Sequence, residues 1–223
     1  MAEPTIIEGG VNDSIPNSFW DVVDAPVLDP ARYVKYFNDF MSFVLNDWDL
    51  TNGNPTVALD TAGDPGGQLG ISTSGVINND TATILEALPF QMALGKRTWC
   101  AVRAIVGVTA DSEFQAGIKS TAANGIYIRQ NQSATLELVI QNGSGSRVVT
   151  LGTITDTVAF TAGWYYDGGD EVHAYFNDNL ISIETGIASL IDTAQSAPRF
   201  DLENHIAAIR SVAIDYFFGC QDR

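Results

Sequence analysis

The stretch from Lys96 to Ile118 contains two runs in which apolar residues alternate with polar or small residues. The apolar positions are Cys100, Val102, Ala104 and Val106 in the first run, and Phe114, Ala116 and Ile118 in the second. Successive residues of a β-strand point to opposite faces, so this period of two predicts two strands that each bury one face in a core. The polar segment Thr109–Glu113 between them predicts a turn, and the whole stretch is therefore interpreted as a β-hairpin.

Similar alternation recurs along the chain, interrupted by short segments rich in Gly, Asn and Asp. Three of these segments, Asn142–Gly145, Asp167–Asp170 and Asn177–Asn179, have the composition of tight turns. Many short strands separated by turns predict an all-β fold, an antiparallel two-sheet jelly-roll sandwich, with one short helix near residues 187–193. The predicted core positions are Val102, Ala104, Phe114, Ile126, Leu138, Phe176, Ile214 and Tyr216.

The N-terminal residues differ in composition from the remainder. The chain of 223 residues is long enough for one β domain with a substantial core. We expect residues 1–29, which contain three prolines and a Gly-Gly pair, to form an extended arm, and residues 30–223 to form the sandwich, starting with a strand near Tyr33. An arm with large apolar side chains packs either on its own domain or on a partner. We predict that it helps attach the domain through Ile6, Ile7, Phe19 and Trp20.

The charge of the chain restricts its partners. Twenty-seven acidic and eleven basic residues give a formal net charge of −16, and no basic stripe is visible, which argues against nucleic-acid binding through phosphate contacts.

No apolar run is long enough to span a bilayer, and the N-terminus does not have the pattern of a signal peptide. The two cysteines, Cys100 and Cys220, are too few for a disulfide framework, and they can bond to each other only if their strands are adjacent.

Several segments carry a resemblance to a known family. The segment G-K-R-T-W-C-A-V-R-A-I-V and the following D-S-E-F-Q-A-G-I resemble a family of tailed-phage virion structural proteins common among marine viruses, including cyanophages. In that family a strand K-K-T-W-F-x-x-R-F-x-V is followed by S-D-F-x-x-G. The spacing W-x-L-T…G-G-x-L-x-I-S-T and the ending I-D-Y-F-F-G-C-Q-D-R are similar to the family as well. The resemblance runs from about Tyr33 to Arg223 and leaves the arm outside.

The resemblance implies a concanavalin/laminin-G-like jelly roll in a virion protein made in the host bacterial cytoplasm. It favours a capsid decoration (cement) protein on the head exterior, with the major capsid protein as partner. A tail or baseplate component is the alternative position. The apolar arm and the large acidic charge further suggest a homo-oligomer, and we predict a trimer or a protein that binds at a multi-subunit junction.

No pattern in the sequence points to catalysis. Glycosidases need two carboxylates placed across a sugar, whereas the adjacent Asp170 and Glu171 face opposite sides of a strand. Neither an E-x-D-x-x-E strand nor a G-x-S-x-G nucleophile elbow occurs. The two histidines, His173 and His205, are far from each other and from the cysteines, which does not suggest zinc. We therefore predict a protein that is not an enzyme and has no cofactor.

Two weaker binding hypotheses remain. Asp167, Asp170 and Asp178 lie in turns and offer hard oxygen ligands for calcium, although turn formation explains the same residues. Trp164 and Tyr165 next to a turn offer a stacking platform for a glycan, although a strand with core-facing aromatic residues explains them too. A glycan-binding, lectin-like module is therefore the alternative to the structural role.

Overall fold

The structure is a computed structural model, and it describes residues 33–40, 48–51, 56–60, 67–76, 79–85 and 89–223. The described residues form β-strands and one short 3-10 helix, Ala188–Leu190. The strands are β1 Tyr33–Asn38, β2 Trp48–Thr51, β3 Thr56–Asp60, β4 Gln68–Ser72, β5 Asn79–Leu85, β6 Phe90–Gln91, β7 Thr98–Val106, β8 Ser112–Lys119, β9 Gly125–Asn131, β10 Thr135–Asn142, β11 Gly145–Thr153, β12 Phe160–Tyr166, β13 Glu171–Phe176, β14 Asn179–Thr185, β15 Gln195–Asn204 and β16 Ser211–Asp222.

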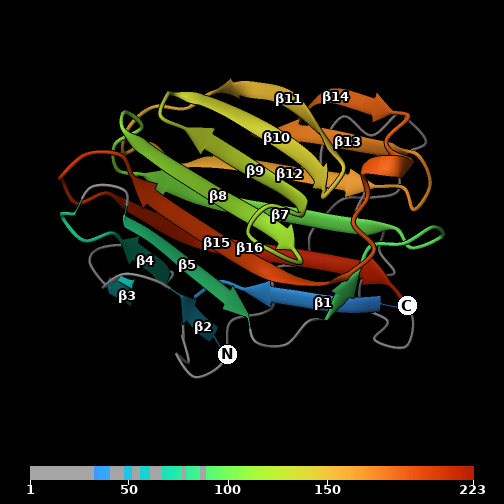
Figure 1. The fold of residues 1–223 in the computed structure, drawn as a ribbon, viewed down its shortest axis with the longest axis horizontal. Helices are drawn as coiled ribbons and strands as arrows, with labels where there is room; N and C mark the ends of the chain where they lie inside the picture. Colours follow the sequence, from blue (N-terminus) through green and yellow to red (C-terminus); the bar gives the residue numbers. More distant parts are fainter. Residues whose placement is uncertain (1–32, 41–47, 52–55, 61–66, 77–78, 86–88) are drawn as a thin grey trace, which may run out of the picture.

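These strands form two antiparallel sheets that pack face to face (Figure 1). Sheet A has the order β14-β13-β12-β7-β16-β4-β3, and β1 also pairs with β16. Sheet B has the order β11-β10-β9-β8-β15-β5-β2, and β6 also pairs with β15. The predicted antiparallel two-sheet sandwich is thus confirmed. In the part of the chain described, no helix is long and apolar enough to cross a membrane.

The core lies between the two sheets. Predicted core residues Val102, Ala104, Phe114, Ile126, Leu138 and Ile214 are all buried in it, and Phe176 packs against it. Tyr216 does not follow the prediction, because β16 has an irregularity between Ile214 and Tyr216 that shifts its pairing with β7. An extra residue in a strand reverses the alternation of the residues after it. Phe217 therefore enters the core, and Tyr216 packs on the opposite side of sheet A.

The stretch Lys96–Ile118 forms two strands, but they are not a hairpin. β7 pairs with β12 and β16 in sheet A, whereas β8 pairs with β9 and β15 in sheet B. The segment between them crosses from one sheet to the other, and Ser112 Oγ donates a hydrogen bond to the carbonyl of Val108 within it. The alternation of apolar residues reveals which face of a strand is buried, but it does not reveal the neighbouring strand. The hairpin prediction was wrong for this reason.

The other local predictions have mixed outcomes. Asn142–Gly145 joins β10 to β11 as a tight hairpin, and Asn177 and Asp178 form the β13–β14 turn with φ of 47° and 63°. The predicted helix at 187–193 is only the short 3-10 turn. Cys100 and Cys220 lie on adjacent strands but on opposite faces of sheet A, so both are free thiols. The arm, with Ile6, Ile7, Phe19 and Trp20, lies outside the described residues.

Candidate functional site

The outer faces of the two sheets, which point away from the core, differ in chemistry. We call the outward side chains of β8, β9, β10 and β15 in sheet B the polar face. They include Glu113, Gln115, Lys119, Tyr127, Arg129, Glu137, Gln141, Arg199, Asp201 and Glu203. We call a second hydrophobic cluster on the outside of sheet A the aromatic face. It consists of Tyr33, Trp99, Ala101, Tyr175, Phe218 and Cys220, with Tyr165, Leu180 and Tyr216 packed against them.

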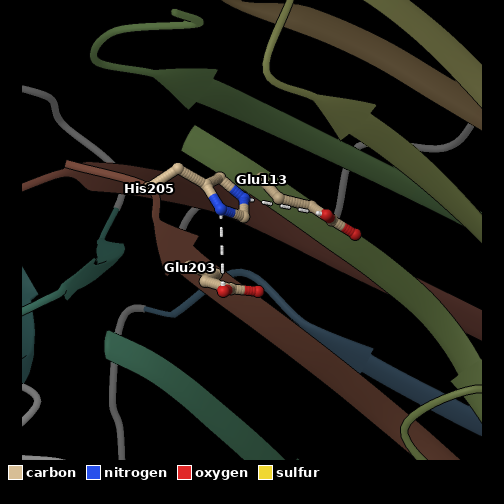
Figure 2. Close-up of side chains that lie close together, drawn as sticks. All are labelled: Glu113, Glu203 and His205. Carbon is tan, nitrogen blue, oxygen red and sulfur yellow. Dashed lines mark ion pairs between the residues drawn. The ribbon is translucent and has the colours of Figure 1, made fainter. Parts of the chain in front are cut away.

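At one end of the polar face, two glutamates and a histidine converge (Figure 2). Glu113 on β8 and Glu203 on β15 are direct cross-strand neighbours. His205 follows β15, and its backbone N–H donates a 2.9 Å hydrogen bond to the carbonyl of Asp111. The Nδ1 atom of His205 lies 3.7 Å from Oε1 of Glu203, and its Nε2 atom lies 4.0 Å from Oε2 of Glu113. Each ring nitrogen thus faces a different carboxylate.

This arrangement favours a positive charge between the two carboxylates. Two like charges directly opposite each other on antiparallel strands repel, and a cation between them offsets that repulsion. One donor atom from each of Glu113, Glu203 and His205 lies within 4.8 Å of the other two, and carboxylate oxygen and imidazole nitrogen are ordinary ligands of divalent metals. Among the described side chains, these are the residues that could hold a metal ion.

A buried lysine organises the middle of the polar face. The side chain of Lys119 has no exposed surface, and its Nζ donates to Asp201 Oδ2 at 2.7 Å and to Gln115 Oε1. The same ammonium lies 4.2 Å from the ring centre of Tyr127, a cation–π contact. Burial lowers the pKa of Lys119, and the charge of Asp201 opposes that shift. A buried ion remains stable only when it is paired in this way.

The remaining polar side chains are held by hydrogen bonds to one another. Arg129 donates from Nε and Nη2 to Oε2 of Glu137, at 3.0 and 2.8 Å. The hydroxyl of Tyr127 donates to Gln141 Oε1 at 3.1 Å, and burial raises the pKa of that phenol. Arg129, Glu137 and Gln141 are all partly exposed. The face therefore presents planar polar groups in fixed positions on rigid strands, the arrangement suited to binding a polar ligand.

The predicted aromatic residues separate across sheet A. Trp164 is only 1% exposed and belongs to the core, so the interpretation of this residue as a glycan platform was wrong. Tyr165 points the other way and is part of the aromatic face, where its ring stacks on Trp99 with ring centres 5.2 Å apart. His173 contacts the Tyr165 ring edge-on at 5.3 Å, and its Nε2 lies 3.4 Å from Glu171. Strand β12 thus places Trp164 in the core and Tyr165 on the aromatic face, because successive strand residues point to opposite sides of a sheet.

The predicted calcium ligands form turns instead. Asp167 Oδ1 accepts hydrogen bonds from the backbone N–H groups of Gly169 and Glu171. Asp170 accepts from those of Gly186 and Ala188, both at 2.9 Å. Asp178 occupies the left-handed position of the β13–β14 turn. Within the described residues, none of the three belongs to a group of three potential metal ligands, so the cluster that could bind a cation lies elsewhere, at Glu113, Glu203 and His205.

Comparison with known proteins identifies the fold but no family. No protein-family model and no curated protein matches this sequence. A protein of unknown function from Shewanella oneidensis MR-1 is similar in structure, with a TM-score of 0.59, 12% identity, and coverage of 86% of this chain and 87% of that one. The carbohydrate recognition domain of Emp46p, in its metal-free form, is similar with a TM-score of 0.55 and 10% identity, and the match covers 78% of this chain and 88% of that one. The binding domain of Botulinum neurotoxin DC, in complex with rat synaptotagmin II, is similar with a TM-score of 0.56 and 11% identity, and the match covers 77% of this chain and 43% of that one. The chain therefore shares the fold of these proteins, an antiparallel jelly-roll sandwich.

Proposed function

We propose that this protein is a carbohydrate-binding module and that the polar face of sheet B contacts the glycan. The observation that carries the proposal is the set of partly exposed planar side chains that hydrogen bonds hold in place around Lys119 and Tyr127. Sugars present many hydroxyl groups, each of which both donates and accepts hydrogen bonds. Side chains that are already ordered lose little entropy on binding them, which favours affinity. The shared fold with a carbohydrate recognition domain is consistent with this role.

The same geometry favours binding without cleavage. A retaining glycosidase keeps its two carboxyl groups about 5–5.5 Å apart on either side of the scissile bond. Glu113 and Glu203 are close enough, but the imidazole of His205 faces both of them (Figure 2). A scissile bond would have to displace that ring. We therefore expect a bound oligosaccharide to remain intact.

The test begins with an array of bacterial and eukaryotic oligosaccharides, followed by calorimetric titration of the strongest hit. Glu203→Gln on the polar face is compared with Glu171→Gln on the outside of sheet A, because each glutamate lies on a strand, two residues before a histidine that it contacts. A hydrogen bond to a charged group contributes roughly 1.5–3 kcal/mol, so Glu203→Gln should weaken binding about tenfold or more while Glu171→Gln leaves it unchanged. An array without any hit, or equal losses in both variants, would overturn the proposal.

A second candidate function rests on the sequence motifs. Their resemblance to tailed-phage structural proteins supports a place on the exterior of a virion, with capsid decoration first and the tail or baseplate second. The resembling segments named above fall on β2, β4, β7, β8 and β16, in both sheets of the sandwich. A glycan-binding face is compatible with this role, because an exterior virion protein meets surface glycans of the host.

Copy number tests the virion role directly. Quantitative mass spectrometry of purified particles should find hundreds of copies for a head decoration protein that contacts the major capsid protein, and far fewer for a tail component. Immunogold labelling then locates the protein on head or tail, and the mass of the released protein tests the predicted trimer. Absence of the chain from purified particles would exclude this candidate and leave the glycan proposal standing.

A further inference from the structure

The cluster of Glu113, Glu203 and His205 contains a ring nitrogen without a hydrogen bond. Within the part of the chain that the structure describes, Nε2 of His205 is buried and has no hydrogen-bond partner. Its distance of 4.0 Å from Oε2 of Glu113 is too long for a hydrogen bond. Buried polar atoms of native proteins nearly always have a partner, so an exception requires an explanation. Because Nε2 faces a carboxylate (Figure 2), a cation bound between them would contact both groups.

We propose that Glu113, Glu203 and His205 form a binding site for a divalent transition-metal ion such as Zn²⁺. Zinc binds nitrogen and carboxylate oxygen at about 2.0–2.2 Å, which places two ligand atoms about 3.4 Å apart at a tetrahedral angle. The separations in the cluster, 3.7 Å to Glu203 and 4.0 Å to Glu113, are only slightly longer. One ring nitrogen binds the ion, and one donor atom from each residue lies within 4.8 Å of the other two. Small side-chain rotations therefore suffice to close the site around an ion.

Hydrogen bonds from neighbouring groups orient these ligands. The side-chain amide of Gln115 donates from Nε2 to Oε1 of Glu113 at 2.5 Å, while Oε2 of Glu113 faces His205. The amide oxygen of Gln115 in turn accepts a hydrogen bond from Lys119. The backbone N–H of His205 donates to the carbonyl of Asp111 at 2.9 Å. Outer partners of this kind fix the orientation of metal ligands and increase the affinity for the metal.

The chemistry of the cluster favours a transition metal over calcium. Imidazole nitrogen is a common ligand of zinc, whereas calcium takes about six to eight oxygen ligands. The charge of a divalent ion balances the two carboxylates, and Arg210 pairs with Asp111 instead, at 3.9 Å between Nη2 and Oδ2. The ligand side chains keep 19–34% of their surface exposed, so an ion can enter from solvent. Three protein ligands leave a coordination position open, as in zinc sites that bind a further ligand.

Calorimetric titration of the full-length chain with Zn²⁺ tests the site, after treatment with EDTA and exchange into buffer without chelator. His205→Gln removes the imidazole but keeps every carboxylate, and it should weaken zinc binding at least tenfold. His173→Gln, at the matching pair with Glu171, should leave zinc binding unchanged. Ca²⁺ should bind to the wild type at least tenfold more weakly than Zn²⁺. Equal zinc affinity of His205→Gln and wild type, or calcium binding as tight as zinc binding, would overturn the proposal.

Nitrogen NMR of the wild-type protein supplies a readout that does not require any variant to fold. The chain contains two histidines, His173 and His205, so their ring signals can be told apart. Zinc should shift a ring nitrogen signal of His205 and leave the signals of His173 in place. Shifts of both rings together, or of neither, would show that zinc binds elsewhere, attracted by the net charge of −16, and would overturn the proposal. No glycan is present in either experiment, so the outcome does not depend on glycan binding.

Discussion

The two outer faces of the sandwich each carry a glutamate two residues before a histidine, in different surroundings. On the polar face, the Glu203–His205 pair meets a third titratable group, Glu113, from the neighbouring strand. On the aromatic face, the Glu171–His173 pair meets the ring of Tyr165. The same local motif therefore forms a charged cluster in one place and the margin of a hydrophobic cluster in the other. The neighbouring strand, more than the motif, decides what such a pair can do.

The faces also differ in how they hold their buried groups. The aromatic face buries rings against rings and keeps its charges at the edges, as in the Arg97–Asp222 pair at 2.8 Å. The polar face buries the charge of Lys119 itself and satisfies it with Asp201 and Gln115. Packed apolar surface stabilises the fold, whereas a satisfied polar network leaves donors and acceptors near the surface for a ligand. This contrast indicates that the outside of sheet A stabilises the fold, and it supports the proposal that the outside of sheet B binds a ligand.

The largest expected effect is on the aromatic face. Trp99→Ala should lower the free energy of unfolding by about 3–5 kcal/mol, as for truncation of a buried aromatic residue, and Phe114→Ala in the core should cost a similar amount. Urea denaturation measures both, with the exposed Val148→Ala as a control that should change stability by less than about 0.5 kcal/mol. A loss below about 1 kcal/mol for Trp99→Ala would show that the aromatic face does not act as a second core.

A smaller loss is expected at the centre of the polar face. Lys119→Met removes the buried ammonium that donates to Asp201 and Gln115, while Arg199 continues to donate to Asp201. A hydrogen bond to a charged group contributes roughly 1.5–3 kcal/mol, which sets the expected loss. Arg129→Met, which breaks the more exposed pair with Glu137, should cost less than about 1 kcal/mol. The same denaturation experiment compares them. Equal stability of Lys119→Met and wild type would mean that the lysine network does not hold this face together.

Glu203→Gln should change stability in the opposite direction. At pH 8 the substitution removes the repulsion between the carboxylates of Glu113 and Glu203, which are direct cross-strand neighbours. Such cross-strand pairs differ by about 0.2–1 kcal/mol, so we expect a gain of that size in thermal stability measurements. Glu171→Gln, which faces no second carboxylate in its described contacts, should be neutral. A stability loss for Glu203→Gln would show that other groups already offset the repulsion between Glu113 and Glu203.

At alkaline pH, titratable residues on the two outer faces should change the stability of the protein in opposite directions. Burial raises the pKa of Tyr165, so the unfolded chain loses that proton first, and this residue's contribution to stability falls as pH rises above 10. Burial lowers the pKa of Lys119, so the folded protein loses that proton first, and its contribution grows as pH rises toward 10.5. Tyr165→Phe should therefore flatten the alkaline loss of stability, and Lys119→Met should steepen it. Identical pH profiles in the two variants would contradict both assignments.

The sequence predicts features that depend on neighbouring residues along one strand. The buried faces of β7 and β8 follow from alternation at Val102 and Phe114, and the Asn-Gly turn predicts the β10–β11 hairpin. Features that depend on pairing between distant strands cannot be predicted from the sequence in this way. The sheet change between β7 and β8 was missed, and the irregularity after Ile214 moved Tyr216 to the outer face.

The candidate site belongs to the second kind of feature. Glu113 and Glu203 meet only because β8 and β15, far apart in the sequence, pair in one particular register. A shift by one residue would turn one of them into the core. The Glu-x-His spacing at Glu203 and His205 was the one available signal, and it is indistinguishable from the same spacing at Glu171 and His173. Local periodicity therefore predicts the strands and their buried faces, whereas the site depends on which distant strands pair and in which register.

The most direct test of the central claim is a titration of the isotopically labelled protein, followed by NMR, with the strongest glycan from the array. We predict that amide and side-chain shifts concentrate on β8, β9, β10 and β15, including the side-chain amides of Gln115 and Gln141, while β7, β12 and β13 stay unchanged. Shifts centred on the aromatic face, around Tyr165 and His173, would contradict the assignment of recognition to sheet B.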